Sequence, residues 1–285
     1  MRQPYPSDLT NDQWSFLADQ FSEAETGRPR EVDIREVVNA IFYVNRTGVQ
    51  WRYLPHDFPR WEVVYSYFRK WKEDKTWDRL LRILREGVRQ SVGREASPSM
   101  GCVDSQSVKG TECGGEHGID GHKKINGVKR HIFVDTMGLM VAVCVTAAVV
   151  TDAKAARDLF SRVEAEGLPR LTKVLGDHVY GNEQLPEWTA ANTKFRLEVT
   201  KKPAEPKDKK KDKKEKKEFK VVKWRWVVER TFAWLGRYRR NSRDYEMLPE
   251  SSESMLKISS IQLMINRLKP KSNKFVFHYR KAQKT

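Results

Sequence analysis

Between residues 10 and 92, apolar side chains recur every three or four positions, which is the spacing of one face of an α-helix. Four such sets predict four helices, and they begin at Trp14, Ile34, Trp61 and Trp77. Thr10 and Gln13 have the spacing of a capping box before the first set, and Gly48 supplies a helix stop after the second. The pattern therefore predicts a small helical domain over residues 1–95.

Beyond a loop around Pro98, short and nearly continuous apolar runs replace the helical spacing. They predict five strands, over residues 100–104, 131–134, 139–148, 172–175 and 195–200. Helical sets separate or follow the later strands, over residues 152–166, 183–191, 224–235 and 254–268. The order β-β-β-α-β-α-β-α is typical of a mixed sheet with helices on its faces, so residues 96–270 are predicted to form an α+β or α/β domain.

The chain is strongly basic, because 54 Lys and Arg against 38 Asp and Glu give its 285 residues a net charge of +16. Such a balance favours a polyanionic partner, and nucleic acid is the first to consider. Residues 201–223 hold twelve Lys and five acids with few apolar side chains, which predicts a solvated insert. Residues 271–285 form a basic tail. The charge of the chain therefore points to DNA or RNA.

The sequence lacks the features of a membrane or exported protein. Its longest uncharged stretch, Thr136 to Thr151, is shorter than the ~18–20 residues that span a bilayer. The first residues contain no apolar signal-peptide core, and three Cys offer no disulfide framework. We therefore expect a protein of the reducing cytoplasm that has no membrane partner.

Two acids follow predicted strands, and a third lies in an apolar helix. Asp104 ends the first predicted strand and Asp177 follows the fourth. Because sites in open α/β sheets lie at strand ends, these two carboxylates can converge although they are far apart in the sequence. Glu229 lies among apolar residues of the helix over 224–235, where an unpaired carboxylate is costly. The three acids are therefore candidates for a common site.

Three carboxylates without His or Cys select hard cations such as Mg²⁺ or Mn²⁺. Two such ions ~3.5–4 Å apart can activate a hydroxyl and stabilise the leaving oxygen of a phosphodiester. Each acid also has a structural interpretation, since Asp at a strand end is commonly a turn or cap residue and Arg225 can pair with Glu229 on a helix. The combination in a basic chain favours phosphoryl transfer on DNA.

Four stretches of the second half are recognisable as motifs: CVDSQSVKG at 102–110, GHKKINGVKRHIFVDTMGLMVAV at 121–143, VLGDHVYGN at 174–182 and WRWVVERTFAWLGRYRRNSRDYE at 224–246. Together they resemble the bacterial insertion-sequence transposases of the DDE type, in the insertion-sequence-five group. YPSDLTNDQW near the N-terminus and TGVQWRYLPHDFP at 47–59 resemble the helical domain that precedes the catalytic domain in that group. The likeness covers most of the chain outside the insert and the tail.

The resemblance implies a ribonuclease-H-like fold in which Asp104, Asp177 and Glu229 form the metal-binding DDE triad. It implies Mg²⁺ as the cofactor, with Mn²⁺ as a substitute, and a homodimer or larger synaptic complex that brings two element ends together. Arg225 matches the arginine that precedes the glutamate in the signature of the group. The chain departs from that signature at Val222, where a tyrosine is usual, and at Gly236, where a lysine is expected.

Basic side chains around the acids are the predicted DNA contacts, because cations offset the repulsion between an acidic centre and phosphates. They are Lys123, Lys124, Lys129 and Arg130 near the second strand, and Arg225, Arg237, Arg239 and Arg240 around Glu229. Arg28 and Arg30 lie in an extended basic peptide that suits a minor groove. Arg46, Arg52, Arg69 and Lys70 alternate with aromatic residues, which suits a helix-turn-helix-like reader. Ordinary surface basicity is the alternative for each of them.

The sequence therefore predicts a DNA transposase associated with the bacterial nucleoid. Its helical domain is expected to recognise terminal inverted repeats, and its DDE domain is expected to cleave and transfer strands of element and target DNA with two metal ions. Two alternatives share the fold, namely a sequence-specific DNA-binding protein without the chemistry and a nuclease that only hydrolyses DNA. The intact acids at positions 104, 177 and 229 argue against the first alternative.

Overall fold

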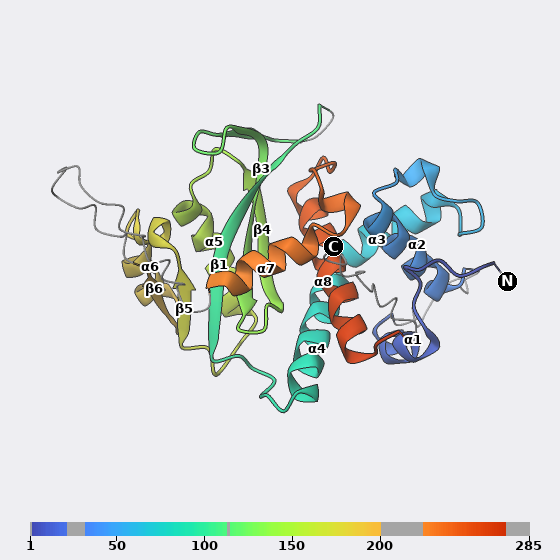
Figure 1. Cartoon of the computed structure of the whole chain (residues 1–285), viewed down its shortest axis with the longest axis horizontal. Coiled ribbons are helices and arrows are strands. Elements are labelled where there is room, and N and C mark those ends of the chain that lie inside the picture. Colours follow the sequence, from blue (N-terminus) through green and yellow to red (C-terminus); the bar gives the residue numbers. More distant parts are fainter. Residues whose placement is uncertain (1, 22–31, 113–114, 201–224, 272–285) are drawn as a thin grey trace, which may run out of the picture.

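The computed structural model describes residues 2–21, 32–112, 115–200 and 225–271. The predicted Lys-rich insert, the two N-terminal arginines Arg28 and Arg30, and the tail beyond Lys271 lie outside these residues. Figure 1 shows the N-terminal helices at one end of the molecule and the sheet at the other.

Four helices confirm the helical spacing of the first 92 residues. They are α1 (Asn11–Leu17), α2 (Ile34–Thr47), α3 (Trp61–Glu73) and α4 (Thr76–Ser91), with 3₁₀ turns at Ala18–Gln20 and Trp51–Tyr53. The capping box forms, since the Thr10 hydroxyl accepts from the Gln13 N–H and the Gln13 side chain accepts from the Thr10 N–H. Gly48 ends α2 at a φ of 75°, and a Cβ there would lie 3.1 Å from the Cβ of Arg239. Both the backbone conformation and the close approach therefore require glycine.

Within the described residues, six strands form one mixed sheet. They are β1 (Met100–Lys109), β2 (Gly118–Asp120), β3 (Ile125–Asp135), β4 (Met140–Ala147), β5 (Lys173–Gly176) and β6 (Arg196–Val199). β3 lies between β4 and β1, β5 and β6 follow on the other side of β1, and the short β2 pairs with the start of β3. Pairing is antiparallel among β1, β3 and β4 and parallel from β1 to β5 to β6. A helical region followed by a ribonuclease-H-like α+β domain confirms the predicted fold class.

All five predicted strands are present, but β1 and β3 are longer than the sequence pattern indicates. β1 continues through Asp104 to Lys109, because its antiparallel pairing with β3 runs on to the pair of Lys109 with Gly127. The prediction that Asp104 ends its strand is therefore wrong. The parallel neighbour β5 does end at Gly176, so Asp104 lies level with the end of the parallel part of the sheet.

Helices cover both faces of the sheet. On one face α5 (Asp152–Ala165) and α6 (Leu185–Asn192) pack on a core that contains Val103 and Phe133. On the other face α7 (Arg225–Leu235) and α8 (Pro249–Leu268) pack on a core that contains Cys102 and Ile132. Alternate residues of β1 thus point to opposite faces, so Asp104 shares the face of Cys102 and α7. The N-cap of α5 is Thr151, whose side chain accepts from the Lys154 N–H, and Asp152 is the first helical residue.

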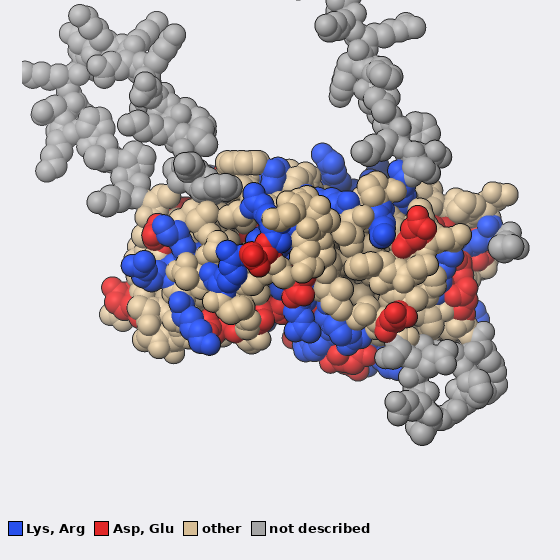
Figure 2. Space-filling view, turned by 90° about the horizontal axis from the view of Figure 1, so that it is seen from below, with Lys and Arg blue, Asp and Glu red and all other residues tan. Residues whose placement is uncertain are grey.

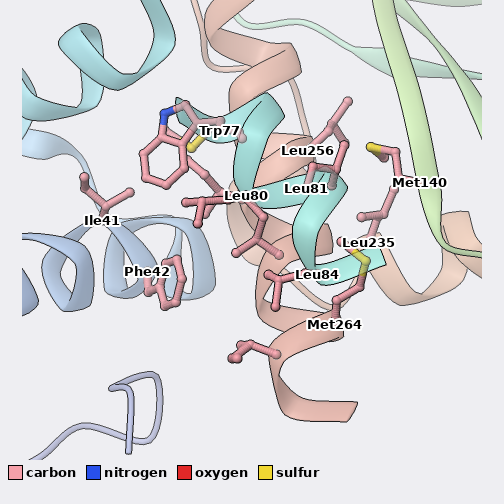
Figure 3. Packing of buried hydrophobic residues seen from close by; sticks show 14 of the residues in the cluster. Ile41, Phe42, Trp77, Leu80, Leu81, Leu84, Met140, Leu235, Leu256 and Met264 are labelled. Carbon is pink, nitrogen blue, oxygen red and sulfur yellow. The ribbon is translucent and has the colours of Figure 1, made fainter. Parts of the chain in front are cut away.

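The core on the α7 face is continuous with the core of the N-terminal helices. Figure 3 shows side chains of α2, α4, β4, α7 and α8 in one packed group, including Phe42, Leu84, Met140, Leu235 and Met264. α8 begins five residues before the predicted start, and every residue from Ser251 to Gln262 is buried. Side chains of α2, α8 and the turn after α7 are also joined through buried hydrogen bonds: the Asn45 amide donates to the Met255 carbonyl at 2.9 Å, and the Asn241 amide donates to the Ser259 hydroxyl at 2.8 Å. The boundary at residue 95 stays a prediction, since one core spans it.

No helix in the described part of the chain is both long and apolar enough to cross a membrane. Seen from below, Lys and Arg side chains lie in several separate groups on the described surface, with acidic side chains among them (Figure 2). Charge alone therefore does not single out one DNA-facing patch on that side. Which cations can contact DNA depends on the exposure and the contacts of each residue.

Candidate active site and basic surface

The pairing register of two parallel strands brings Asp104 and Asp177 to the same level of the sheet. Cys102 of β1 pairs with Leu175 of β5, and each of the two acids follows its paired residue by two positions. Because side chains two positions apart on extended backbone share a face, both carboxylates lie on the face that α7 covers. Asp177 keeps an extended conformation, with φ −75° and ψ 178°, although β5 has ended. The structure thus brings together two of the three predicted acids.

Asp177 has a structural role as well as a place at this site. It is the N-cap of the 3₁₀ helix at His178–Gly181, where one of its carboxylate oxygens accepts from the Val179 N–H at 3.0 Å. The Asp104 carboxylate accepts from the Ser105 N–H at 2.7 Å. These local bonds fix the orientation of both carboxylates, which is the preorganisation that a metal or catalytic site needs.

Tyr180 is a buried residue of the 3₁₀ helix that Asp177 caps. Burial raises the pKa of its phenol well above the ordinary value, and the negative charges of Asp104, Asp152 and Asp177 add to the shift. Its ring packs 3.1 Å from the position that a Cβ on Gly176 would take.

Glu229 lies on the exposed side of α7, which packs across β1 and β3 on the same face of the sheet (Figure 1). Its neighbours Val227 and Val228 are buried in the core beneath the helix. The prediction that Glu229 is surrounded by apolar side chains is therefore wrong, because the apolar side chains point inward and the carboxylate points outward. The helix itself packs against β1, the strand that carries Asp104.

Among the residues that the structure describes, no group of three or more His, Cys, Asp or Glu side chains is close enough to hold a metal ion. Asp104 and Asp177 provide two carboxylates at one level, and Mg²⁺ in phosphoryl-transfer enzymes is commonly bound by one or two carboxylates, water and the substrate phosphates. The donor set therefore fits Mg²⁺, with Glu229 as a third acid on the adjoining helix.

Four side chains of α7 and α8 form a stacked row that the sequence analysis missed. The Arg230 guanidinium lies 4.3 Å from the ring centre of Trp226 and 4.4 Å from that of Trp234, and the Arg267 guanidinium lies 4.3 Å from Trp234. Trp226, Arg230 and Trp234 are four residues apart, a spacing that could have revealed the row in the sequence. Trp226 is 46% exposed, so a rigid aromatic and cationic surface adjoins Glu229.

Two of the predicted DNA contacts are exposed on the turn between β2 and β3. Lys123 and Lys124 are both exposed, and the turn is held by Asp120, whose carboxylate accepts from the N–H groups of His122 and Lys123 at 3.0 and 3.1 Å. The other oxygen of that carboxylate accepts from the Ser107 hydroxyl. The turn therefore exposes two lysine side chains, and its backbone is held by hydrogen bonds to Asp120.

Lys129 and Arg130 are buried, which contradicts the expectation that they face DNA. The Lys129 ammonium donates to the Val150 carbonyl at 2.9 Å and lies 3.4 Å from Asp152. The Arg130 guanidinium donates to the Asn241 carbonyl at 2.7 Å, and burial lowers the pKa of this group to about 10. Successive residues of β3 point to opposite covered faces of the sheet, so each cation is bound by protein groups.

The basic residues after α7 divide in the same way. Arg237 and Arg239 are exposed and remain candidates for DNA contact. Arg240 is buried and pairs with Glu246 at 2.7 Å, so the expectation that it faces DNA is also contradicted. Arg225 begins α7, but its side chain lies outside the described part of the structure, as do Arg28 and Arg30.

His131 is a buried histidine of β3. Its ring is fully buried, its Nε2 lies 3.0 Å from the Thr146 hydroxyl, and Lys129 and Asp152 flank it. Burial lowers the pKa of the imidazole to about 4, with Lys129 lowering it further and Asp152 opposing the shift. The neutral ring is therefore favoured in the folded state, and the unfolded chain binds the proton more readily.

We expect the free energy of unfolding to fall as the pH drops from about 6.5 towards 4, by roughly 3 kcal/mol from this group. Urea unfolding at a series of pH values measures the effect, and the His131→Gln variant should lose this part of the pH dependence. An unchanged pH profile in the variant would contradict the assignment to His131.

Two protein-family descriptions match the chain. "Putative transposase of IS4/5 family" matches residues 9–81, which cover most of the N-terminal helices, and "Transposase DDE domain" matches residues 95–261, which cover the whole sheet and most of α8. No curated protein matches the chain. The second match spans more than half of the sequence and includes all three predicted acids. The chain therefore belongs to the DDE transposases, in the IS4/5 family.

Proposed function

We propose that this transposase binds the terminal inverted repeats of an insertion sequence and cleaves and transfers DNA strands with two divalent metal ions, acting on chromosomal DNA in the bacterial cell. The observation that carries the proposal is the parallel register of β1 and β5, which sets Asp104 level with Asp177 beneath the helix that bears Glu229. The three proposed metal ligands are all carboxylates, which favours a hard cation.

Asp104 and Asp177 would hold Mg²⁺ between them and the DNA phosphate, and Glu229 would complete the set from α7. When bound, the metal ions activate a water or a 3′-hydroxyl and stabilise the leaving oxygen of the phosphodiester. The backbone N–H groups of Ser105 and Val179 orient the two aspartates, so their oxygens need little rearrangement when the cofactor binds. Glu229 is exposed, so DNA and metal can reach it without opening the core.

Exposed cations on the described surface of this half of the chain support DNA as the substrate. Lys123 and Lys124 lie on the ordered turn beside the sheet, and Arg237 and Arg239 follow α7. Trp226 and Arg230 add a stacked aromatic and guanidinium surface next to Glu229, a combination that suits contact with nucleotides. Strand transfer joins two element ends, so we propose that the active form is a homodimer or a larger complex on DNA.

Incubation of the protein with end-labelled duplex carrying an element end and Mg²⁺, followed by mapping of the products, tests the proposal. We expect cuts at the element boundary and joined products with a target duplex. Cuts without any joined product would favour the nuclease alternative, and binding without cuts would favour a DNA-binding protein that has lost the chemistry.

A further inference from the structure

A cavity of about 410 Å³ lies where α2, α8 and the turn after α7 meet, away from Asp104 and Asp177. Its wall joins the N-terminal helices to the catalytic half, since Phe42 and Arg46 come from α2, Gln262 and Asn266 from α8, and Arg237 from the turn. The segment before α1 and the residues just after α8 close the remaining sides. Both matched family regions therefore contribute to one cavity.

Three cations and no acid line this cavity. They are Arg46, Arg237 and Lys271, and no residue of the described wall is Asp or Glu. Asp8, which follows Ser7 of the wall in the sequence, is itself paired with Arg2 at 2.7 Å. Burial lowers the pKa of Lys271; Asp8 opposes this shift and Arg46 adds to it. The cavity therefore holds an excess of positive charge that the protein does not neutralise there.

Neutral groups hold Arg46 and Lys271 in place, so the charge of these two cations stays available. The Arg46 guanidinium donates to the Arg237 carbonyl at 3.2 Å and lies 5.0 Å from the ring centre of Tyr238. The Lys271 ammonium donates to the carbonyls of Pro6 and Asp8 at 2.7 and 2.6 Å. Carbonyls and an aromatic ring fix the position of a cation but leave its full charge to attract an anion.

Two further donors in the wall have no partner among the described residues. They are the Ser7 hydroxyl and the Gln262 amide nitrogen, both buried atoms, and Gln262 as a whole is 5% exposed. A buried polar atom without a hydrogen bond is costly, so such atoms commonly mark a place where a ligand or water binds. A tetrahedral oxyanion accepts several hydrogen bonds at once and would satisfy these donors together with the cations.

We propose that this cavity binds a phosphate of the DNA backbone and so anchors the helical region and the catalytic region to the same duplex. The inference rests on the proposed function for the identity of the substrate. Arg237 is exposed, so the positive charge of the cavity continues to the outer surface of the protein. The residues that follow Lys271 in the sequence contain Lys and Arg but no acid, so charge disfavours them as the occupant.

The test measures the affinity of the full chain for a 30-base-pair duplex by fluorescence anisotropy over a series of salt concentrations. Arg46→Gln should weaken binding about tenfold at moderate salt and reduce the slope of log affinity against log salt by about 0.9, the change for one phosphate contact. Lys271→Gln should have a similar effect. Because Lys271 lies at the edge of the fold, this variant provides the test if Arg46→Gln proves unstable. Arg170→Gln removes one charge from an exposed residue elsewhere and should change neither quantity.

An unchanged slope in both the Arg46→Gln and Lys271→Gln variants would overturn the proposal. If Arg170→Gln reduced the slope of log affinity against log salt as much as Arg46→Gln does, the proposal would also be overturned. The reduction would then come from the lower net charge of the protein and not from the cavity. Melting curves in inorganic phosphate and in chloride of equal ionic strength form a separate arm. If phosphate stabilises the wild type but not Arg46→Gln while the DNA slopes stay equal, the cavity takes a free phosphate and the DNA assignment is wrong.

Cleavage assays keep this inference separate from the proposed function. A wild-type protein that binds DNA through the cavity but never cuts it would leave the inference standing and refute the proposed chemistry. A protein that cuts element ends normally but shows no slope change in the two variants would refute the inference alone.

Discussion

Replacing Asp104 or Asp177 by Asn, or Glu229 by Gln, is expected to lower the rate of DNA cleavage by about 10³-fold or more while leaving DNA binding near the wild-type value. Each change removes one negative charge from a carboxylate that would bind metal and keeps the side-chain volume. The backbone N–H bonds that orient Asp104 and Asp177 can still form to an amide oxygen, so the fold is retained. Single-turnover cleavage of labelled element-end DNA in Mg²⁺ measures the effect.

Asp19→Asn is the matched control, because Asp19 is an exposed acid on the N-terminal helices, remote from the sheet. This variant should cut DNA at the wild-type rate. If any one of the three site variants also cuts at that rate, the residue concerned does not belong to the catalytic set.

Asp135→Ala is expected to destabilise the fold by roughly 3–5 kcal/mol, the largest stability effect that we expect from a single polar substitution. Asp135 is fully buried at the end of β3 and pairs with the guanidinium of Arg89, which is almost fully buried on α4. Its other carboxylate oxygen accepts from the N–H groups of Met137 and Leu139 at 2.8 and 2.9 Å and so holds the turn to β4. The substitution leaves a buried positive charge without its partner.

Thermal and urea unfolding of the intact chain measure this effect, with Glu198→Ala as the control. Glu198 pairs with Lys173 at 2.8 Å on the surface of the sheet, and loss of an exposed pair changes stability by less than about 1 kcal/mol. Arg89→Met combined with Asp135→Ala should recover part of the loss, because no unpaired charge is then buried. Equal unfolding curves for Asp135→Ala and Glu198→Ala would contradict the role of the pair.

The sequence was sufficient to find Asp104 and Asp177 because a run of apolar residues followed by an acid is a local signal. That the two acids lie at the same level of the sheet could not be predicted from the sequence. It depends on β1 and β5 being neighbours and on the register that pairs Cys102 with Leu175. Asp104 also lies inside β1 rather than at its end. The antiparallel partner extends the strand, and no local pattern of β1 itself marks that extension.

The basic run before and within β3 shows where local reasoning fails. Lys123, Lys124, Lys129 and Arg130 are close in the sequence and look alike, yet the first two are exposed and the last two are buried. The difference arises because β3 is covered on one face by the start of α5 and on the other by residues 241–243, both distant in the chain. Burial of a cation therefore depends on partners that a single strand pattern does not contain.

The central position of α8 limits how chimeras can be built from this transposase and related proteins. Because its residues from Ser251 to Gln262 are enclosed on every side, and because it packs against α2, α3 and α4 as well as β4, the helices that precede the sheet are completed by the last helix described in the chain. A chimera that exchanges residues 1–95 as a self-contained cassette would pair one parent's helices with the other parent's α8. An exchange of the N-terminal helices therefore also has to preserve the fit of residues 249–268 against both those helices and β4.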